Sequence, residues 1–162
     1  GIVNDGKSAW STDAMVRRVD VSGQELVGAH VHLHAEVGKA SHAPISEDIA
    51  IPTDPSSEFL VVESGAHRAF WFYGKDAWLS LPTAAYDLEI KAMPGGFRID
   101  VHAQTLVRDL VIDPSRLAVD GVVDRNLLTM LPDDRVSIEF RSSEPIDPAR
   151  FSDLGVFLAA NF

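Results

Sequence analysis

The feature that most constrains this chain is a strict two-residue alternation of apolar and polar side chains. Val136–Arg141 alternates without exception, and Phe97–Ala103, Tyr86–Ala92 and Ala29–Ala35 follow the same period. Successive side chains of a β-strand point to opposite faces, so each run buries one face and exposes the other. Alternation of this kind is typical of antiparallel sheets. We therefore predict an all-β protein.

Glycine-containing turns separate these runs at hairpin spacing. Pro94-Gly95-Gly96, Ser64-Gly65 and Ser22-Gly23 each lie between two alternating runs, so they predict three hairpins. The inward side chains change from odd to even positions between Ala103 and Leu106, which predicts a bulge or bend before the next strand.

Helical content is expected to be small. Asp113-Pro114 and Asp147-Pro148 each place an N-cap acid before a proline at the first helical position, which predicts single turns over about 114–118 and 148–153. No amphipathic pattern reaches three turns. The predicted fold is two consecutive small immunoglobulin-like antiparallel β-sandwiches with only single-turn helices.

The 162 residues divide best into two pieces. A junction is expected within 75–82, after an aromatic strand and close to Leu81-Pro82. We place one sandwich at 1–78, lacking its first strand, and a C-terminal sandwich at 79–162. Each piece is just large enough to bury a core.

Charge and composition exclude several classes of function. Fourteen basic and 24 acidic residues give a formal net charge of −10, whereas nucleic acids and anionic membranes attract a basic face. The chain has no cysteine, so thiolate metal sites, iron–sulfur clusters and cysteine nucleophiles are excluded. We expect no cofactor, no nucleic acid and no membrane partner.

Three histidines on one predicted strand are weak candidates for a metal site. His30, His32 and His34 recur at spacing two, so all three side chains point to the same face. Imidazoles arranged in this way can bind zinc if another element adds a ligand. The alternative, which the buried pattern of Val31 and Leu33 favours, is an ordinary polar strand face. We assign no metal.

A run of aromatic side chains is the second candidate. In Phe70-Trp71-Phe72-Tyr73, Trp71 and Tyr73 point away from the face of Phe70 and Phe72, and Trp78 follows shortly. Exposed aromatic rings stack on sugars or join domains. Trp71, Tyr73 and Trp78 are therefore possible contacts with sugar or with another domain.

The sequence offers no catalytic constellation. Carboxylates are abundant, but glycoside hydrolysis needs two at a defined separation, and no spacing here predicts such a pair. The serines lack a nucleophile elbow, and there is no glycine-rich phosphate loop. We assign no catalytic residue. The chain begins at Gly1 without methionine, basic start or apolar signal core, which we interpret as a piece of a longer protein.

Several stretches together resemble the C-terminal β-sandwich region of glycoside hydrolase family 2 enzymes of the β-mannosidase type. The resemblance covers nearly the whole chain and rests on these stretches: Val3-Asn4-Asp5, the D-x-x-G-x-x-L pattern of Asp20–Leu26, Ala69–Phe72 with Lys75-Asp76, Ala103–Leu110 continuing to Leu127–Pro132, and Val156–Asn161. Asp133-Asp134 stands where the family has Gly-Glu. Aspartate tolerates the left-handed backbone that the glycine supplies, so the turn is expected to survive.

The resemblance implies that catalysis is carried out by another domain of the parent enzyme. Family members carry their retaining acid/base and nucleophile glutamates on a TIM barrel, and no stretch here matches that barrel. The chain would be a non-catalytic accessory region whose partner is the catalytic barrel of the same parent chain. Two alternatives stay open: an independent carbohydrate-binding module, and a protein-interaction sandwich.

Overall fold

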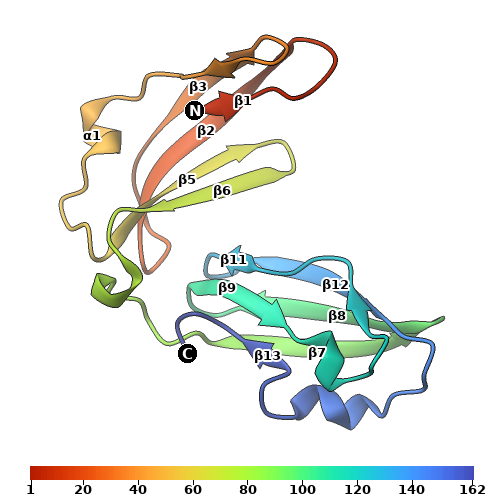
Figure 1. The fold of residues 1–162 in the computed structure, drawn as a ribbon. Helices are drawn as coiled ribbons and strands as arrows, with labels where there is room; N and C mark the ends of the chain where they lie inside the picture. Colours follow the sequence, from red (N-terminus) through yellow and green to blue (C-terminus); the bar gives the residue numbers. More distant parts are fainter. The chain divides into compact units, whose positions relative to one another are not determined.

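The computed structural model describes residues 1–162 and confirms the all-β prediction. It contains thirteen strands, one four-residue α-helix and three short 3-10 helices. The chain forms two compact units, Gly1–Ser80 and Leu81–Phe162, whereas the sequence placed the boundary after Trp78. Figure 1 shows the strands of both units.

The first unit is built on a four-stranded antiparallel sheet in the order β3-β2-β5-β6. The strands are β2 (Trp10–Asp20), β3 (Glu25–Ala35), β5 (Glu58–Ser64) and β6 (His67–Phe72). A separate two-stranded sheet pairs β1 (Ile2–Val3) with β4 (Ala40–Ser41). The helix α1 (Glu47–Ala50) and the 3-10 helix η1 (Asp76–Trp78) were not predicted, because neither is long enough to create an amphipathic period.

A buried ion pair joins β2 to β5 in the first unit. The guanidinium of Arg18 binds the carboxylate of Glu58, and both side chains are almost fully buried. The Glu58 carboxylate also accepts hydrogen bonds from the backbone N–H of Thr53 (3.1 Å) and of Asp54 (3.0 Å). A buried charge is tolerated when it is paired and hydrogen-bonded, so Glu58 anchors the loop before β5.

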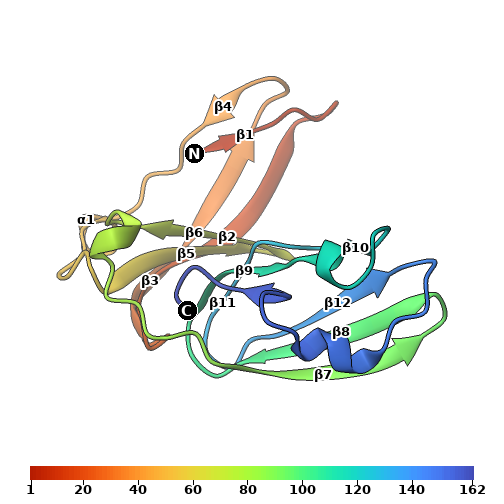
Figure 2. The same cartoon turned by 60° about the horizontal axis from the view of Figure 1, so that its bottom comes forward.

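The second unit is a sandwich of two antiparallel sheets, and Figure 2 shows its strands from a second direction. One sheet has the order β10-β12-β8-β7, and the other has the order β11-β9-β13. The strands are β7 (Tyr86–Met93), β8 (Gly96–Ala103), β9 (Val107–Ile112), β10 (Val122–Val123), β11 (Leu128–Met130), β12 (Arg135–Arg141) and β13 (Phe157–Leu158).

The core of the second unit consists of the inward side chains of these strands. Ile99 lies opposite Ile138, and Phe97 lies opposite Phe140, across the β8–β12 pair. Ile99, Ile138 and Phe140 are completely buried. Phe151 packs edge-on against Phe140 with ring centroids 5.7 Å apart, an arrangement that aromatic quadrupoles favour.

All three predicted hairpins are confirmed. Met93 pairs with Gly96 across the β7–β8 turn, and Ser64 pairs with His67 across the β5–β6 turn. In the β2–β3 turn, the carboxylate of Asp20 accepts hydrogen bonds from the backbone N–H of Ser22 and of Gln24. These local turns depend on residues close in sequence, which explains why the sequence predicts them.

The predicted bend after β8 is a change of sheet. β8 ends at Ala103, and β9 begins at Val107 in the opposite sheet. The backbone N–H groups of Gln104 and Thr105 both donate to the carbonyl of Ala85. The change of parity in the sequence therefore marks the point at which the chain crosses the core.

The predicted single turns and the aspartate turn are also confirmed. The 3-10 helices η2 (Pro114–Arg116) and η3 (Pro148–Ser152) begin after Asp113 and Asp147, whose carboxylates accept the N–H of Ser115 and of Ala149. Asp133 has φ of 70°, in the left-handed region. The carboxylate of Asp134 accepts the N–H of Leu131 at 2.7 Å, which closes this turn.

Asn161 ties the end of the chain to two other segments of the second unit. Its Oδ1 accepts the backbone N–H of Arg108 at 2.9 Å. Its Nδ2 donates to the carbonyl of Pro82 at 2.8 Å and to that of Leu106 at 2.7 Å. One amide therefore holds the start of the unit and the β8–β9 crossing against its C-terminal segment.

We predict that Asn161→Ala destabilises the chain by about 2–3 kcal/mol, because three side-chain hydrogen bonds are lost and their backbone partners are left without this amide. Urea unfolding measures the change. Leu154→Ala is the matched control on the same segment, since Leu154 is 96% exposed and its truncation should cost less than about 0.5 kcal/mol. Equal stabilities of the two variants would contradict this role of Asn161.

Candidate functional site

The strongest candidate site is the outer face of the sheet that contains β7, β8 and β12. Strand register places polar side chains in rows across this face. Asp87, His102 and Arg135 form one row, because Asp87 pairs with His102 and His102 pairs with Arg135. The next row, two residues along, contains Glu89, Asp100 and Ser137.

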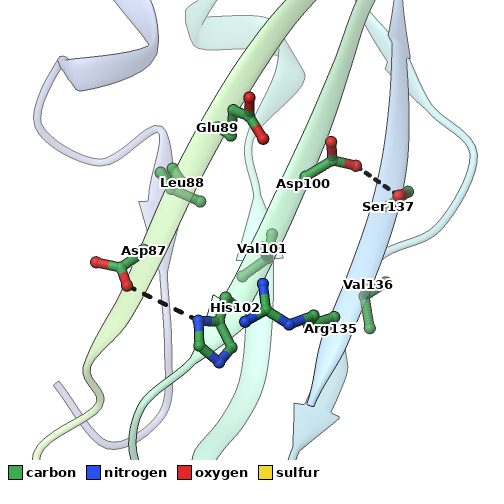
Figure 3. A pocket seen from close by; sticks show the side chains of 9 residues that line it. All are labelled: Asp87, Leu88, Glu89, Asp100, Val101, His102, Arg135, Val136 and Ser137. Atoms are coloured by element: carbon green, nitrogen blue, oxygen red, sulfur yellow. Dashed lines mark hydrogen bonds and ion pairs between the residues drawn. The ribbon is translucent and has the colours of Figure 1, made fainter. Parts of the chain in front are cut away.

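These two rows line a groove with a volume of about 460 Å³. Figure 3 shows the groove from close by. Its lining residues come from three strands: Asp87, Leu88, Glu89, Asp100, Val101, His102, Arg135, Val136 and Ser137. The volume lies within the range of small-molecule sites, although its lining is more polar than is usual for such sites.

His102 lies between two carboxylates in the first row. Its Nδ1 is 3.9 Å from Oδ2 of Asp87, and its Nε2 is 3.8 Å from Oδ1 of Asp133. Oδ2 of Asp87 also accepts a hydrogen bond of 2.8 Å from Nε2 of Gln104. The imidazole therefore has an acidic group on each side, while the Asp87 carboxylate remains largely exposed.

The negative charges of the second row are compensated by basic side chains of the same sheet. Asp100 accepts hydrogen bonds from Oγ of Ser137 (2.5 Å), from Nζ of Lys91 (3.2 Å) and from Arg98 (3.1 Å). The Ser137 hydrogen bond is the main cause that holds the pKa of Asp100 below its usual value. Lys91 also binds Glu89 at 2.7 Å. The hydrogen bonds that Lys91 donates, first to Glu89 and then to Asp100, raise the pKa of Lys91.

Arg135 is the exception on this face, because its guanidinium has no hydrogen-bond or ion-pair partner. Figure 3 shows the side chain extending from β12 toward His102 across the groove. A guanidinium carries five N–H donors, so the groove holds several donors that the protein leaves unused.

The aromatic residues singled out in the sequence lie in the first unit and have different surroundings. Trp71 on β6 is 65% exposed and Trp78 in η1 is 69% exposed, with Nζ of Lys75 lying 5.3 Å from the Trp78 ring centroid. Tyr73 instead donates a hydrogen bond from its hydroxyl to the carbonyl of Ile49 at 3.1 Å. Burial raises the pKa of Tyr73.

The other half of this aromatic run faces the interior, as its alternation predicts. Phe72 stacks on the buried Phe59 with ring centroids 4.8 Å apart, and Phe70 lies 6.2 Å from the same ring. Trp71 in this run and Trp78 in η1 are therefore the exposed aromatic side chains among the candidates.

His30, His32 and His34 lie on the exposed face of β3, and the last two contact neighbouring side chains. His32 contacts Oδ1 of Asp13 and Oγ of Ser11, both at 2.8 Å, and His34 contacts Oε1 of Glu36 at 3.0 Å. No group of three or more His, Asp or Glu side chains in the chain could hold a metal ion. No helix is long and apolar enough to cross a membrane.

A family model matches the second unit of this chain. Residues 81–154 match the family model Ig_mannosidase, which is described as an Ig-fold domain. A comparison with curated protein sequences gives no match.

A solved structure has a similar fold over almost the whole chain. The crystal structure of a β-D-mannosidase from Dictyoglomus thermophilum superposes with a TM-score of 0.69 and 14% sequence identity over 97% of this chain. The chain spans only 19% of that protein's length. This match concerns the fold.

Sequence reasoning missed the groove. The alternating runs identify the outward side chains of each strand, but the row Asp87–His102–Arg135 also requires β12 to pair with β8 at one register. About thirty residues and a second sheet lie between these strands, and the intervening segment contains no signal for that pairing.

We predict that Ser137→Ala raises the pKa of Asp100 toward its ordinary value, because the hydrogen bond that most favours the carboxylate is removed. A carbon-13 NMR titration of the Asp100 carboxyl measures the shift. A pKa that is lower in the folded than in the unfolded state adds to the free energy of unfolding at neutral pH, and this contribution is lost as pH falls through the folded-state pKa. The difference in stability between the unmodified chain and the variant should therefore shrink as pH falls through the pKa of Asp100.

Ser115→Ala is the matched control for this titration. Ser115 donates to Asp113 and is the main cause of the lowered pKa of that residue. The control should move the midpoint of Asp113 and leave Asp100 unchanged. An unchanged Asp100 midpoint in Ser137→Ala would show that Ser137 does not set its pKa.

Proposed function

We propose that this chain is a non-catalytic accessory region of a larger glycoside hydrolase, because residues 81–154 match the family model Ig_mannosidase, an Ig-fold domain. The parent would be an enzyme of glycoside hydrolase family 2 that hydrolyses terminal β-mannosides with retention. The family match carries the proposal, and the fold shared with a β-D-mannosidase supports it.

The chemistry of the groove supports a non-catalytic role. Glycoside hydrolysis uses a carboxylic acid of raised pKa together with a second carboxylate. The pKa of Asp100 is lowered instead, and both Asp100 and Glu89 bind Lys91. A carboxylate that is kept ionised by a neighbouring cation carries no proton at neutral pH, so it is a poor general acid.

The proposed role is to support the catalytic barrel of the same parent chain. The second unit has a continuous core and a C-terminal segment tied to it by hydrogen bonds, which suits a supporting domain. Substrate choice would then belong to the barrel.

The test is hydrolysis of a chromogenic β-mannoside by the 162-residue chain and by the full-length product of its gene. We expect no rate above the buffer for the chain alone and clear hydrolysis by the full-length protein. Hydrolysis by the chain alone would overturn the non-catalytic assignment, and a full-length protein inactive on β-glycosides would overturn the parent assignment.

The exposure of Trp71 and Trp78 favours a second candidate, a carbohydrate-binding module. Tryptophan rings left in water by a folded domain offer an apolar surface that matches the face of a sugar ring. The two rings are similarly exposed, and Nζ of Lys75 lies 5.3 Å from the centroid of the Trp78 ring, so we choose Trp71 as the platform to test.

For this candidate, Trp71→Ala should weaken binding of soluble mannan about tenfold or more, which corresponds to about 1.4 kcal/mol. Calorimetric titration measures the affinity, and Trp10→Phe is the control because Trp10 lies on β2, outside the aromatic run. A flat titration of the unmodified chain against several glycans would dispose of the module hypothesis.

A further inference from the structure

We infer that the groove across β7, β8 and β12 binds a neutral, hydroxyl-rich ligand, such as one or two sugar residues, through Arg135, His102 and Asp87. This inference goes beyond the proposed function, since it concerns the second unit and does not require a particular parent enzyme. It rests on the unused hydrogen-bonding groups that the strand register brings together.

The unpaired guanidinium of Arg135 is the first observation. Every other basic side chain on this outer face has an acidic partner: Lys91 binds Glu89 and Asp100, Arg98 binds Asp100, and Arg141 binds Glu139. Arg135 has no such partner, although it lies on the same strand as Arg141. Its donors point into a groove that is large enough for a small ligand.

Acceptors lie beside these donors. One oxygen of Asp87 binds Gln104, and the carboxylate is 66% exposed, so it has free lone pairs toward solvent. His102 lies between Asp87 and Arg135, on the strand that separates them. Adjacent strands are about 4.8 Å apart, so donor and acceptor groups alternate over a distance that one ligand can span.

The balance of charge favours a neutral ligand over an ion. Asp87 and Arg135 have opposite charges on either side of His102, and the next row is neutralised by Lys91 and Arg98. An anion would meet the carboxylates of Asp87 and Asp133, whereas a cation would meet the guanidinium. The chain offers no metal-binding group of three His, Asp or Glu side chains. Hydroxyl groups both donate and accept, and so they match the whole row.

The test is an NMR titration of the nitrogen-15-labelled 162-residue chain with mannobiose and cellobiose as neutral probes. Glucuronate and calcium chloride serve as anionic and cationic probes. We expect saturable shifts at amides of β7, β8 and β12 with a neutral probe, at a Kd of the order of 1 mM. Arg135→Gln should weaken this binding about tenfold, and Arg141→Gln should leave it unchanged.

Asp87→Ala provides a second variant on the opposite strand and should also weaken binding. Absence of saturable shifts in the groove with both neutral probes would overturn the inference. So would equal affinities of the Arg135→Gln variant and the unmodified chain, or saturation by glucuronate or calcium alone. Loss of the shifts in Trp71→Ala with retention in Arg135→Gln would assign the sugar to the first unit and overturn the groove.

Discussion

The register of β12 on β8 is the constraint on which the second unit depends. On the inner face it places Ile138 opposite Ile99 and Phe140 opposite Phe97, so large apolar side chains of the two strands pair on the core side of the sheet. On the outer face the same register places Arg135 opposite His102. Because side chains alternate along a strand, a shift of β12 by one residue relative to β8 would turn its apolar side chains to solvent and its polar side chains to the core. The core and the groove would then be lost at the same time.

Electrostatics on the outer face follow from the same pairing. Carboxylates and basic groups that lie across or along neighbouring strands neutralise one another, as Lys91 does with Glu89 and Asp100. Such exposed pairs add little stability, but they keep the face soluble and discourage pairing with other sheets. Arg135 stands out because this arrangement leaves it without a partner, and we therefore place the ligand of the groove beside it.

The relation to mannosidases concerns a scaffold. The family match covers residues 81–154, and the chain corresponds to 19% of the length of a β-D-mannosidase with a similar fold. Immunoglobulin-like sandwiches support many functions through sites added to their faces and loops. The proposed accessory role and the groove are thus separate properties: the role depends on the packed core of the unit, and the groove depends on its outer face.

By itself, the sequence determined what depends on near neighbours: the alternating strands, the three hairpins, the capped turns after Asp113 and Asp147, and the left-handed turn at Asp133. Only the tertiary structure decided which distant groups meet. The Arg18–Glu58 pair, the three bonds of Asn161 and the Asp87–His102–Arg135 row each join segments separated along the chain. Local turns are set by backbone sterics and short-range hydrogen bonds, whereas strand partners are chosen by burial of the whole core, which no short stretch of sequence encodes.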